Sequence, residues 1–294
     1  MTGPACHLDG RVVPASEATV SVRDRGFRYG DGAVERLRVY GGDPFEWTAH
    51  ASRFERSCAA LGFDHVLPPT GDLRERVVET LEANGLTEAL VELSATRGVQ
   101  DGDHTPDPRI DPTILVTARE MPRGGVGGER AWDGPARLRT AETRRPPDEA
   151  VPGEARTHAD LTGVLARREV RDEADEALLR DVRGVVCAGV DSNVFFVREG
   201  TLHTPTADLP LYPSIARGVV LEVADDESFP VEAGRYGVGE VRGAEEVFLV
   251  SADWEVRPVT RFDGRDLSVG PLTRLCGRLF DERVERAHYD AGHG

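Results

Sequence analysis

The chain has 294 residues, of which 52 are acidic and 36 basic, so that its net charge at pH 7 is −16. This charge excludes nucleic acid and anionic lipid surfaces as expected partners, because both are themselves negatively charged. No apolar run approaches the roughly 18 residues that span a membrane, and the first residues show no signal-peptide pattern, so we expect a cytoplasmic protein.

The N-terminal part of the sequence predicts a mixed α+β domain over residues 1–120. The dipeptide Asp9-Gly10 favours a tight hairpin turn between short strands. Apolar residues recur at helical spacing in two segments, and Gly85 follows the second, where a helix C-cap favours glycine. The predicted strands cover residues 6–22, 89–94 and 113–118, and the predicted helices cover 48–61 and 72–84.

A stretch rich in glycine and proline, residues 121–135, predicts the connection to a second α+β domain over residues 136–294. Pro271 suits the first turn of a last helix. The residues of that helix that we expect to face the core are Leu272, Leu275, Leu279 and Phe280. The predicted strands of this domain cover 176–180, 185–188, 194–197 and 246–250, and its helices cover 160–173, a segment from 214 onward, and 271–286.

Every basic residue of the chain is arginine, because the sequence contains no lysine. Acidic residues spread along the whole chain are typical of halophilic proteins, whose salty surroundings screen the repulsion between like charges. The four cysteines are far apart and form no Cys-x-x-Cys pair. We therefore expect free thiols and no metal site.

Several motifs resemble those of a known family. Near the N-terminus they are the segment from Ser21 to Glu35, SVRDRGFRYGDGAVE, and the segment His50-Ala-Ser-Arg53. The later landmarks are THADLTGVLAR (157–167), SNVFF (192–196), IAR (215–217) and WEVRPV (254–259). In order and spacing they resemble the class IV aminotransferases, fold-type IV pyridoxal-phosphate enzymes that include branched-chain aminotransferases and aminodeoxychorismate lyase. The resemblance implies a two-domain fold-type IV architecture, a homodimer and pyridoxal phosphate as cofactor.

The sequence departs from this family where the cofactor chemistry takes place. The lysine that forms the Schiff base corresponds to Arg156, whose guanidinium stays protonated and is a poor nucleophile. The glutamate that pairs with the pyridine nitrogen corresponds to Ala188, which cannot keep the ring protonated. The resemblance therefore implies a divergent member in which covalent cofactor binding and the electron sink are both lost.

Anion binding is implied for residues that still match the family or replace its cofactor contacts. Arg53 matches the phosphate-binding arginine, and Ser214-Ile215-Ala216 replaces the helix start that binds the phosphate. Ala252 stands in a turn that is rich in threonine in the family. An ordinary ion pair for Arg53 and a simple N-cap for Ser214 are the alternatives.

Two further residues are candidates in the same region. Arg156 either binds an anionic ligand or fills space in an inactive site. His158, two residues later, is a candidate proton carrier. A lone histidine is more often structural, so this role competes with a simple packing role.

Three functions follow from these observations. The first is a pseudoenzyme that retains the fold and binds a small anion or a partner protein. The second is an active aminotransferase, or an aminodeoxychorismate lyase-like enzyme, that acts on an amino acid or 4-amino-4-deoxychorismate with a non-covalently held cofactor. The third is a structural subunit paired with an active homologue. The joint changes at Arg156 and Ala188 favour the first.

Overall fold

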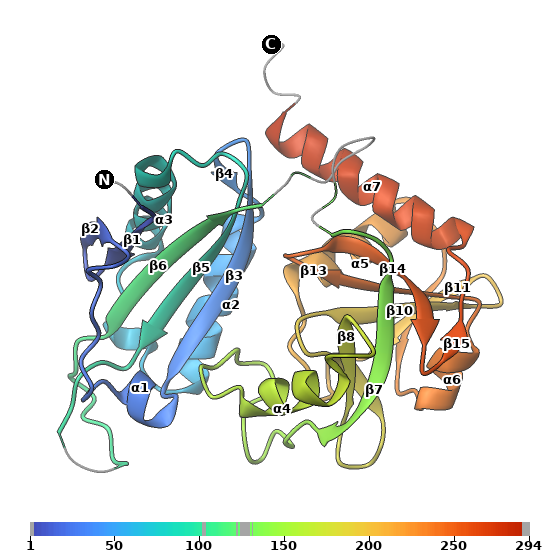
Figure 1. Cartoon of the computed structure of the whole chain (residues 1–294), viewed down its shortest axis with the longest axis horizontal. Coiled ribbons are helices and arrows are strands. Elements are labelled where there is room, and N and C mark those ends of the chain that lie inside the picture. Colours follow the sequence, from blue (N-terminus) through green and yellow to red (C-terminus); the bar gives the residue numbers. More distant parts are fainter. Residues whose placement is uncertain (1–2, 102–103, 122, 124–129, 131, 290–294) are drawn as a thin grey trace. The chain divides into compact units, whose positions relative to one another are not determined.

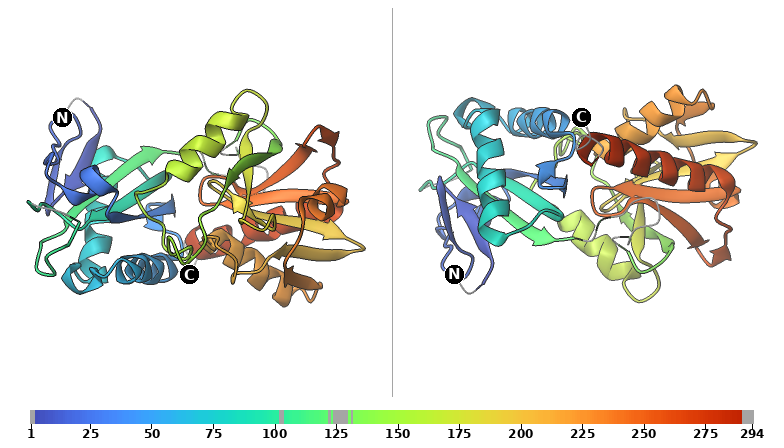
Figure 2. Two further views of the ribbon diagram at one scale, coloured as in Figure 1. Left: turned by 90° about the horizontal axis from the view of Figure 1, so that it is seen from below. Right: turned by 90° about the horizontal axis from the view of Figure 1, so that it is seen from above.

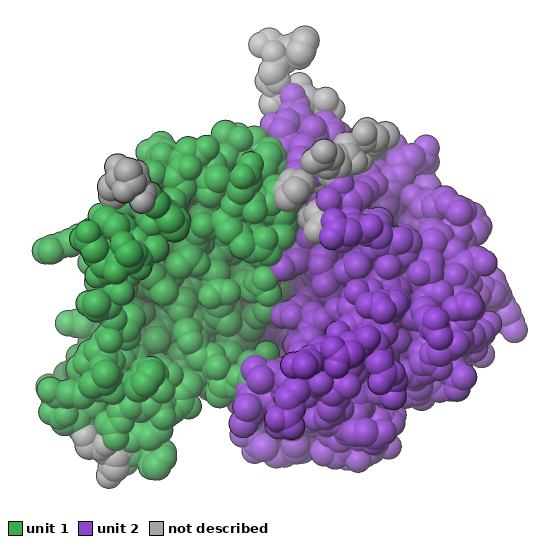
Figure 3. All heavy atoms as spheres, viewed as in Figure 1, with its two compact units in different colours: residues 1–122, 155–160 green, residues 123–154, 161–294 purple. Residues whose placement is uncertain are grey.

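The computed structural model describes residues 3–101, 104–121, 123, 130 and 132–289. The chain forms two compact units (Figure 3), of which unit 1 is Met1–Pro122 with Ala155–Asp160, and unit 2 is Arg123–Glu154 with Leu161–Gly294. The segment 155–160, which the sequence pattern assigns to the C-terminal domain, is part of unit 1 by its contacts. Most of the connection expected over 121–135 lies outside the described residues.

Unit 1 is built on a six-stranded sheet in the order β2-β1-β6-β5-β3-β4. Helices α2 and α3 cover one face of this sheet (Figure 1, Figure 2), and apolar side chains from both helices, such as Phe54 and Val77, share one core with the strands. The β1–β2 hairpin turns at Asp9 and Gly10, both with positive φ, as the sequence predicts. The elements are β1 (Ala5–Leu8), β2 (Arg11–Pro14), α1 (Arg25–Tyr29), β3 (Gly32–Tyr40), β4 (Asp43–Pro44), α2 (Trp47–Ala60), the 3₁₀ turn η1 (Asp64–Val66), α3 (Thr70–Asn84), β5 (Ala89–Thr96) and β6 (Thr113–Glu120).

Unit 2 is built on a nine-stranded sheet in the order β12-β11-β10-β13-β14-β7-β8-β9, with β15 paired to β14. Strand β7 lies between β14 and β8 and is parallel to both. Helix α4 packs on β7 and β8, and helices α5 and α7 pack on each other and on β13. The elements are β7 (Ala136–Arg144), α4 (Leu161–Val170), β8 (Glu176–Arg180), β9 (Val186–Gly189), β10 (Asn193–Arg198), β11 (Thr201–Pro205), α5 (Ile215–Asp226), β12 (Val231–Gly234), α6 (Val238–Gly243), β13 (Glu246–Ser251), β14 (Glu255–Phe262), β15 (Arg265–Asp266) and α7 (Pro271–His288).

The α+β prediction is confirmed, and the predicted elements occur in both units close to their expected positions, except that the strands expected over residues 6–22 end at Pro14. The predicted core face of α7 is wrong in part: Phe280 is buried, but the three leucines are only half-buried. Thr273 and Cys276 face the interior instead, and the N–H and Oγ of Thr273 both donate to the buried carboxylate of Glu246. This polar anchor fixes the rotation of α7. No helix in the described part of the chain combines the length and apolar character needed to cross a membrane.

Candidate functional site

In unit 1, the predicted phosphate-binding residue Arg53 lies on α2 with its side chain buried beside β3. Its Nε donates to Glu35 Oε2 at 3.1 Å, and its Nη2 donates to Glu35 Oε1. His50, one helical turn earlier, places Nδ1 at 2.7 Å from the same Oε1. Because residues three apart share a helix face, α2 presents both side chains to one carboxylate.

Charge pairing decides the ionisation of this cluster. Burial alone raises the pKa of Glu35, but Arg53 and His50 outweigh burial and bring that pKa down to about 2. Burial also lowers the pKa of His50, against the pull of Glu35. Glu35 and Arg53 therefore form a buried ion pair, with side chains 1% and 6% exposed. An anion contact of Arg53 stays a prediction, and Glu35 is the residue that orients the guanidinium.

Arg156 and His158 lie on a segment of unit 1 that runs beside the start of β3. Val34 N donates to Arg156 O at 3.0 Å, and His158 N donates to Gly32 O at 2.9 Å. Arg156 N donates in turn to the Oγ of Ser57 at 3.3 Å. Since Ser57 belongs to α2, the segment that carries the arginine at the lysine position contacts the same helix as the buried ion pair.

The side chain of His158 is exposed but anchored. Its Nε2 lies 2.7 Å from the Oγ of Ser94 on β5. The segment approaches the N-terminal end of β3 closely, because a Cβ at Gly30 would lie 2.9 Å from the Cβ of Ala159, and Gly30 itself has a left-handed φ of 68°. The hydrogen bond between His158 and Ser94 holds the imidazole in place for a structural role and for proton transfer alike.

In unit 2, the other predicted anion-binding residues stand at the start of α5. Ser214 is the N-cap, and its Oγ accepts a hydrogen bond from Arg217 N at 3.0 Å. Asn193 Oδ1 accepts from Ser214 N at 2.8 Å and so fixes where the helix begins. The first N–H groups of a helix have no partner within it, and they lie at the positive end of the helix dipole. Ile215 and Ala216 therefore contribute donors that suit an anion, and the cap role of Ser214 is compatible with this.

Ala252 lies in the turn between β13 and β14. Asn193, the first residue of β10, pairs with Val250 near the end of β13. The same asparagine binds the N–H of Ser214. Within unit 2, the turn that contains Ala252 and the start of α5 are therefore at the same end of the sheet, although they are far apart in the sequence.

Ala188 lies on β9 in apolar surroundings. It is 2% exposed and lies opposite Leu179 of β8. Its cluster consists of Cys187, Leu209 and Leu211, with Val185 at its edge. The next residue, Gly189, lies beside the buried carboxylate of Glu176, because a Cβ at Gly189 would lie 2.9 Å from Glu176 Oε2.

A buried carboxylate that was not predicted as a site residue holds the loop before β10. Glu176 on β8 is 0% exposed and accepts hydrogen bonds from Val190 N at 3.2 Å and Asp191 N at 3.3 Å. It also accepts from Ser192 Oγ at 2.9 Å, and Arg167 Nη2 lies 3.2 Å away. Burial raises the pKa of Glu176 to about 7, although Arg167 acts in the opposite direction.

Three of these buried residues, Glu35, His50 and Glu176, were missed in the sequence. The spacing of His50 and Arg53 is a signal that both side chains leave α2 on one face. Glu176 carries no comparable signal, because it follows Asp175 in an acidic pair at the start of a strand. In the described part of the chain, no group of three or more His, Cys, Asp or Glu residues could hold a metal ion.

Comparison with known proteins places these units in a family. The family model described as amino-transferase class IV matches residues 32–262. A putative branched-chain-amino-acid aminotransferase of Methanocaldococcus jannaschii is 34% identical over 284 residues, which cover 94% of this chain and 95% of the relative.

Two solved structures show the same similarity. The branched-chain aminotransferase of the archaeon Thermoproteus uzoniensis with norvaline has a TM-score of 0.87 at 26% identity, covering 98% of this chain and 96% of the other. The 4-amino-4-deoxychorismate lyase of Pseudomonas aeruginosa has a TM-score of 0.79 at 30% identity, covering 97% of this chain and 99% of the other. Because the family model spans well over half of the sequence and a relative above 30% identity covers nearly all of it, the chain belongs to the class IV aminotransferase family.

Proposed function

We propose that this protein is a class IV aminotransferase homologue that binds a small anion and has lost covalent pyridoxal-phosphate catalysis. The observation that carries the proposal is the absence of lysine from all 294 residues. A Schiff base with the cofactor aldehyde needs a primary amine, and the guanidinium of Arg156 is not a substitute for one. Membership of the family implies pyridoxal phosphate as the cofactor, and the residues present decide whether it fits.

Pyridoxal phosphate does not fit these residues as a catalytic group. The position expected to pair with the pyridine nitrogen is Ala188, which is buried among Cys187, Leu209 and Leu211. Ala188 itself has no carboxylate to keep a ring nitrogen protonated, and the nearby buried carboxylate of Glu176 is bound by Val190 N, Asp191 N and Ser192 Oγ. We derive no reaction step through pyridoxal phosphate.

The residues expected to bind the phosphate are retained more fully. Glu35 and His50 hold Arg53 in place, and Ser214 caps a helix whose first N–H groups suit an anion. These features support a bound phosphate or carboxylate without a covalent link. They also favour a second candidate, an aminotransferase or aminodeoxychorismate lyase-like enzyme that holds pyridoxamine phosphate non-covalently.

A visible absorption spectrum tests the proposal. The protein is incubated with pyridoxal phosphate, the excess is removed, and the spectrum is recorded before and after treatment with borohydride. We expect no cofactor absorbance above the buffer and no trapped adduct on a side chain. Peptide mapping locates any adduct and separates a side chain from the α-amino group of the chain. An adduct at a specific side chain would overturn the proposal.

Two reversions distinguish loss of chemistry from remodelling of the site. The double variant Arg156→Lys/Ala188→Glu restores both groups that the family pattern requires, and Arg156→Lys alone is its matched control. Cofactor absorbance in the double variant would mean that the remaining site is intact and that catalysis was lost at these two positions. Transfer of the amino group from added pyridoxamine phosphate to a 2-oxo acid, giving an amino acid and pyridoxal phosphate, by the unmodified protein would favour the second candidate instead.

We propose further that the protein is a cytoplasmic homodimer. Val22 and Phe27 of unit 1 are each 75% exposed, so they offer apolar surface that a second copy of the chain can cover. Light scattering is expected to give twice the mass of one chain. Co-purification with a homologue that has both the lysine and the glutamate would favour the structural-subunit function.

A further inference from the structure

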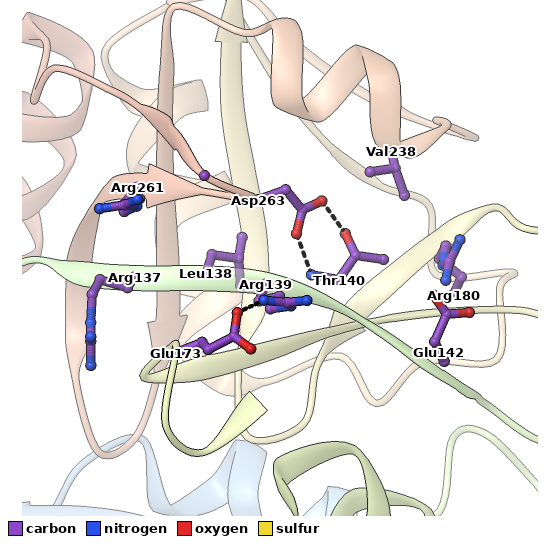
Figure 4. A pocket seen from close by; sticks show the side chains of 11 residues that line it. Arg137, Leu138, Arg139, Thr140, Glu142, Glu173, Arg180, Val238, Arg261 and Asp263 are labelled. Carbon is purple, nitrogen blue, oxygen red and sulfur yellow. Dashed lines mark hydrogen bonds and ion pairs between the residues drawn. The ribbon is translucent and has the colours of Figure 1, made fainter. Parts of the chain in front are cut away.

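Unit 2 contains a cavity of 660 Å³ outside the residues discussed so far. A volume of this order is typical of sites for small molecules, which occupy roughly 300–1,000 Å³. Strands β7, β8 and β14 form its walls, with Val238 of α6 and Gly264 after β14 at its edge. Four arginines line it, and Figure 4 shows how they are spaced around it: Arg137, Arg139, Arg180 and Arg261.

The carboxylates of the cavity are largely committed to other groups. Asp263 accepts from Thr140 N at 2.8 Å and from Thr140 Oγ at 2.7 Å (Figure 4). Glu173 forms an ion pair with Arg139. Of the lining carboxylates, Glu142 alone has a side chain with no hydrogen bond or ion pair to a described residue. In a chain with net charge −16, four arginines at one small cavity are a local reversal of sign.

The sheet places these arginines in like-charged pairs across neighbouring strands. Arg261 on β14 lies directly opposite Arg137 on β7. Arg144 at the end of β7 lies directly opposite Arg180 on β8. Like charges in such positions repel each other. Arg137 is relieved by Asp175, whose Oδ2 lies 3.3 Å from its Nε, whereas no described residue forms an ion pair with Arg144 or Arg180.

In the pair formed by Arg144 and Arg180, some N–H donors have no hydrogen-bond acceptor among the described residues. Arg180 Nη2 donates to Ala141 O at 2.8 Å, but its Nε is buried and has no hydrogen-bond partner among the described residues. Arg144 Nη1 is likewise buried and has no hydrogen-bond partner among the described residues. Burial and the neighbouring Arg144 both lower the pKa of Arg180, while the carboxylates of Glu142 and Asp263 act in the opposite direction without a hydrogen bond to it. Buried donors normally find an acceptor, and a guanidinium without one favours an incoming anion.

We propose that this cavity binds a phosphorylated small molecule, with Arg180 as the main phosphate contact and Arg261, which lines the other end of the cavity, adding positive charge. The planar guanidinium donates two parallel hydrogen bonds to a phosphate, and several arginines together suit its double charge. Arg139 and Arg137 surround the same space with their charges partly neutralised. The ligand supplies the hydrogen-bond acceptors that the buried donors of Arg144 and Arg180 lack, and it adds to the counter-charge of Glu142 and Asp263.

This site is separate from the turn with Ala252, although Arg180 follows Leu179, the cross-strand partner of Ala188. The turn with Ala252 precedes β14, whereas Arg261 lies near the other end of that strand. Strand β14 has 8 residues, so about 25 Å separate its two ends at roughly 3.3 Å per residue. The anion proposed for this cavity is therefore distinct from one bound at the start of α5, and variants at Arg180 and Arg261 leave Arg53 and Ser214 unchanged.

Calorimetric titration with inorganic pyrophosphate tests the proposal at a fixed salt concentration in which the protein is folded. The full chain is compared with the double variant Arg180→Gln/Arg261→Gln. We expect saturable binding to the unmodified protein and binding at least about tenfold weaker in the variant, because charge-assisted hydrogen bonds are lost. Circular dichroism and thermal unfolding show whether the variant keeps its fold.

A matched control removes two positive charges from unit 2 outside the cavity. Arg168 on α4 and Arg274 on α7 are exposed, so Arg168→Gln/Arg274→Gln changes the net charge equally. We expect pyrophosphate to bind this control within about twofold of the unmodified protein. Equal binding in all three proteins, or no binding to the unmodified protein at millimolar ligand, would overturn the proposal.

A second titration tests the class of ligand. Succinate is a dianion that lacks a phosphoryl group. Binding of succinate as tight as that of pyrophosphate would contradict a phosphate site. Preference for pyrophosphate, lost in Arg180→Gln/Arg261→Gln, supports it.

Discussion

Two glutamates, one in each unit, are both fully removed from solvent and yet ionise in opposite ways. Glu35 of unit 1 is 1% exposed and has a pKa of about 2. Glu176 of unit 2 is 0% exposed and has a pKa of about 7. Burial acts in the same direction on both and favours the neutral acid. The difference must therefore come from the partners that each carboxylate has.

The partners of Glu35 include a buried cation, whereas those of Glu176 are mainly neutral dipoles, with the carboxylate of Asp191 nearby raising its pKa further. Arg53 is 6% exposed and binds both oxygens of Glu35. Glu176 accepts from backbone N–H groups and a serine hydroxyl, and its one cation, Arg167, has a side chain 31% exposed. A buried guanidinium in two-point contact outweighs desolvation, whereas several neutral donors and one solvated arginine do not.

The substitution Glu35→Gln has the largest expected effect on this comparison. It leaves the shape of the side chain unchanged but leaves Arg53 as a buried charge without a counter-ion. We expect the free energy of unfolding to fall by about 3–5 kcal/mol. Urea denaturation at pH 7 measures this loss.

A suitable control for this variant is Glu92→Gln. Glu92 lies on β5, where its exposed carboxylate is 3.9 Å from Arg36. A surface ion pair contributes at most about 1 kcal/mol, so the control is expected to change stability very little. Similar losses in both variants would mean that Arg53 does not depend on Glu35.

The pH dependence of stability tests the depressed pKa of Glu35. Its pKa is about 2 in the folded chain and 4.5 without the fold. The stabilisation is therefore complete above about pH 4.5 and is lost as the pH falls from 4.5 toward 2. We expect the difference between the unmodified protein and Glu35→Gln to shrink over this range. A difference that stays constant between pH 6 and pH 3 would contradict the ion pair.

The opposite dependence is expected of Glu176. Its folded pKa of about 7 lies above the ordinary value of 4.5, so between these values the folded chain binds more protons than the unfolded chain. Stability from this group is then greatest below about pH 4.5 and decreases as the pH rises toward 7, by about 1–3 kcal/mol.

The variant Glu176→Gln isolates this contribution, because an amide does not titrate. We expect its stability to vary less than that of the unmodified protein between pH 5 and pH 8, as measured by urea denaturation. Parallel curves would show that the hydrogen bonds to Val190, Asp191 and Ser192 keep Glu176 charged at both pH values. The comparison with Glu35 would then be wrong.

The same physics explains which parts of the fold the sequence pattern predicts. Helices α2 and α3 were predicted from apolar spacing and a glycine cap, which are local signals. Strand β3 was missed because charged residues interrupt its apolar alternation, and two of them, Glu35 and Arg38, are buried. A charged residue indicates an exposed position only when no buried partner of opposite charge is available to it. The sequence does not show which distant segments supply such partners.

The site shows the same limit. The motif with Arg53 was recognised as a unit, but its dependence on Glu35 comes from contact between α2 and β3. The cavity arginines carry no motif at all, because Arg137, Arg180 and Arg261 come together only through the order of strands β14, β7 and β8. On α7 the sequence contains two neighbouring rows of apolar residues. The hydrogen bond from Thr273 to Glu246 determines which row faces the core.

The smallest expected effect concerns a pair of cations and extends the comparison from carboxylates to arginines. The guanidinium of Arg53 is paired with the carboxylate of Glu35, whereas Arg144 on β7 lies opposite another arginine, Arg180, on the neighbouring strand β8. The variant Arg144→Gln removes the repulsion and is expected to raise the free energy of unfolding by about 0.5 kcal/mol. Arg183→Gln, an exposed residue in the nearby turn, is the matched control.

Pyrophosphate sharpens this last test. An anion held at Arg180 supplies the counter-charge that Arg144 lacks, so we expect saturating pyrophosphate to reduce or reverse the gain in stability from Arg144→Gln. Thermal unfolding with and without pyrophosphate measures both effects in one series. If Arg144→Gln instead destabilises the unliganded protein by more than about 1 kcal/mol, Arg144 is held by favourable contacts, and the repulsion between these strands is not what makes the cavity attract an anion.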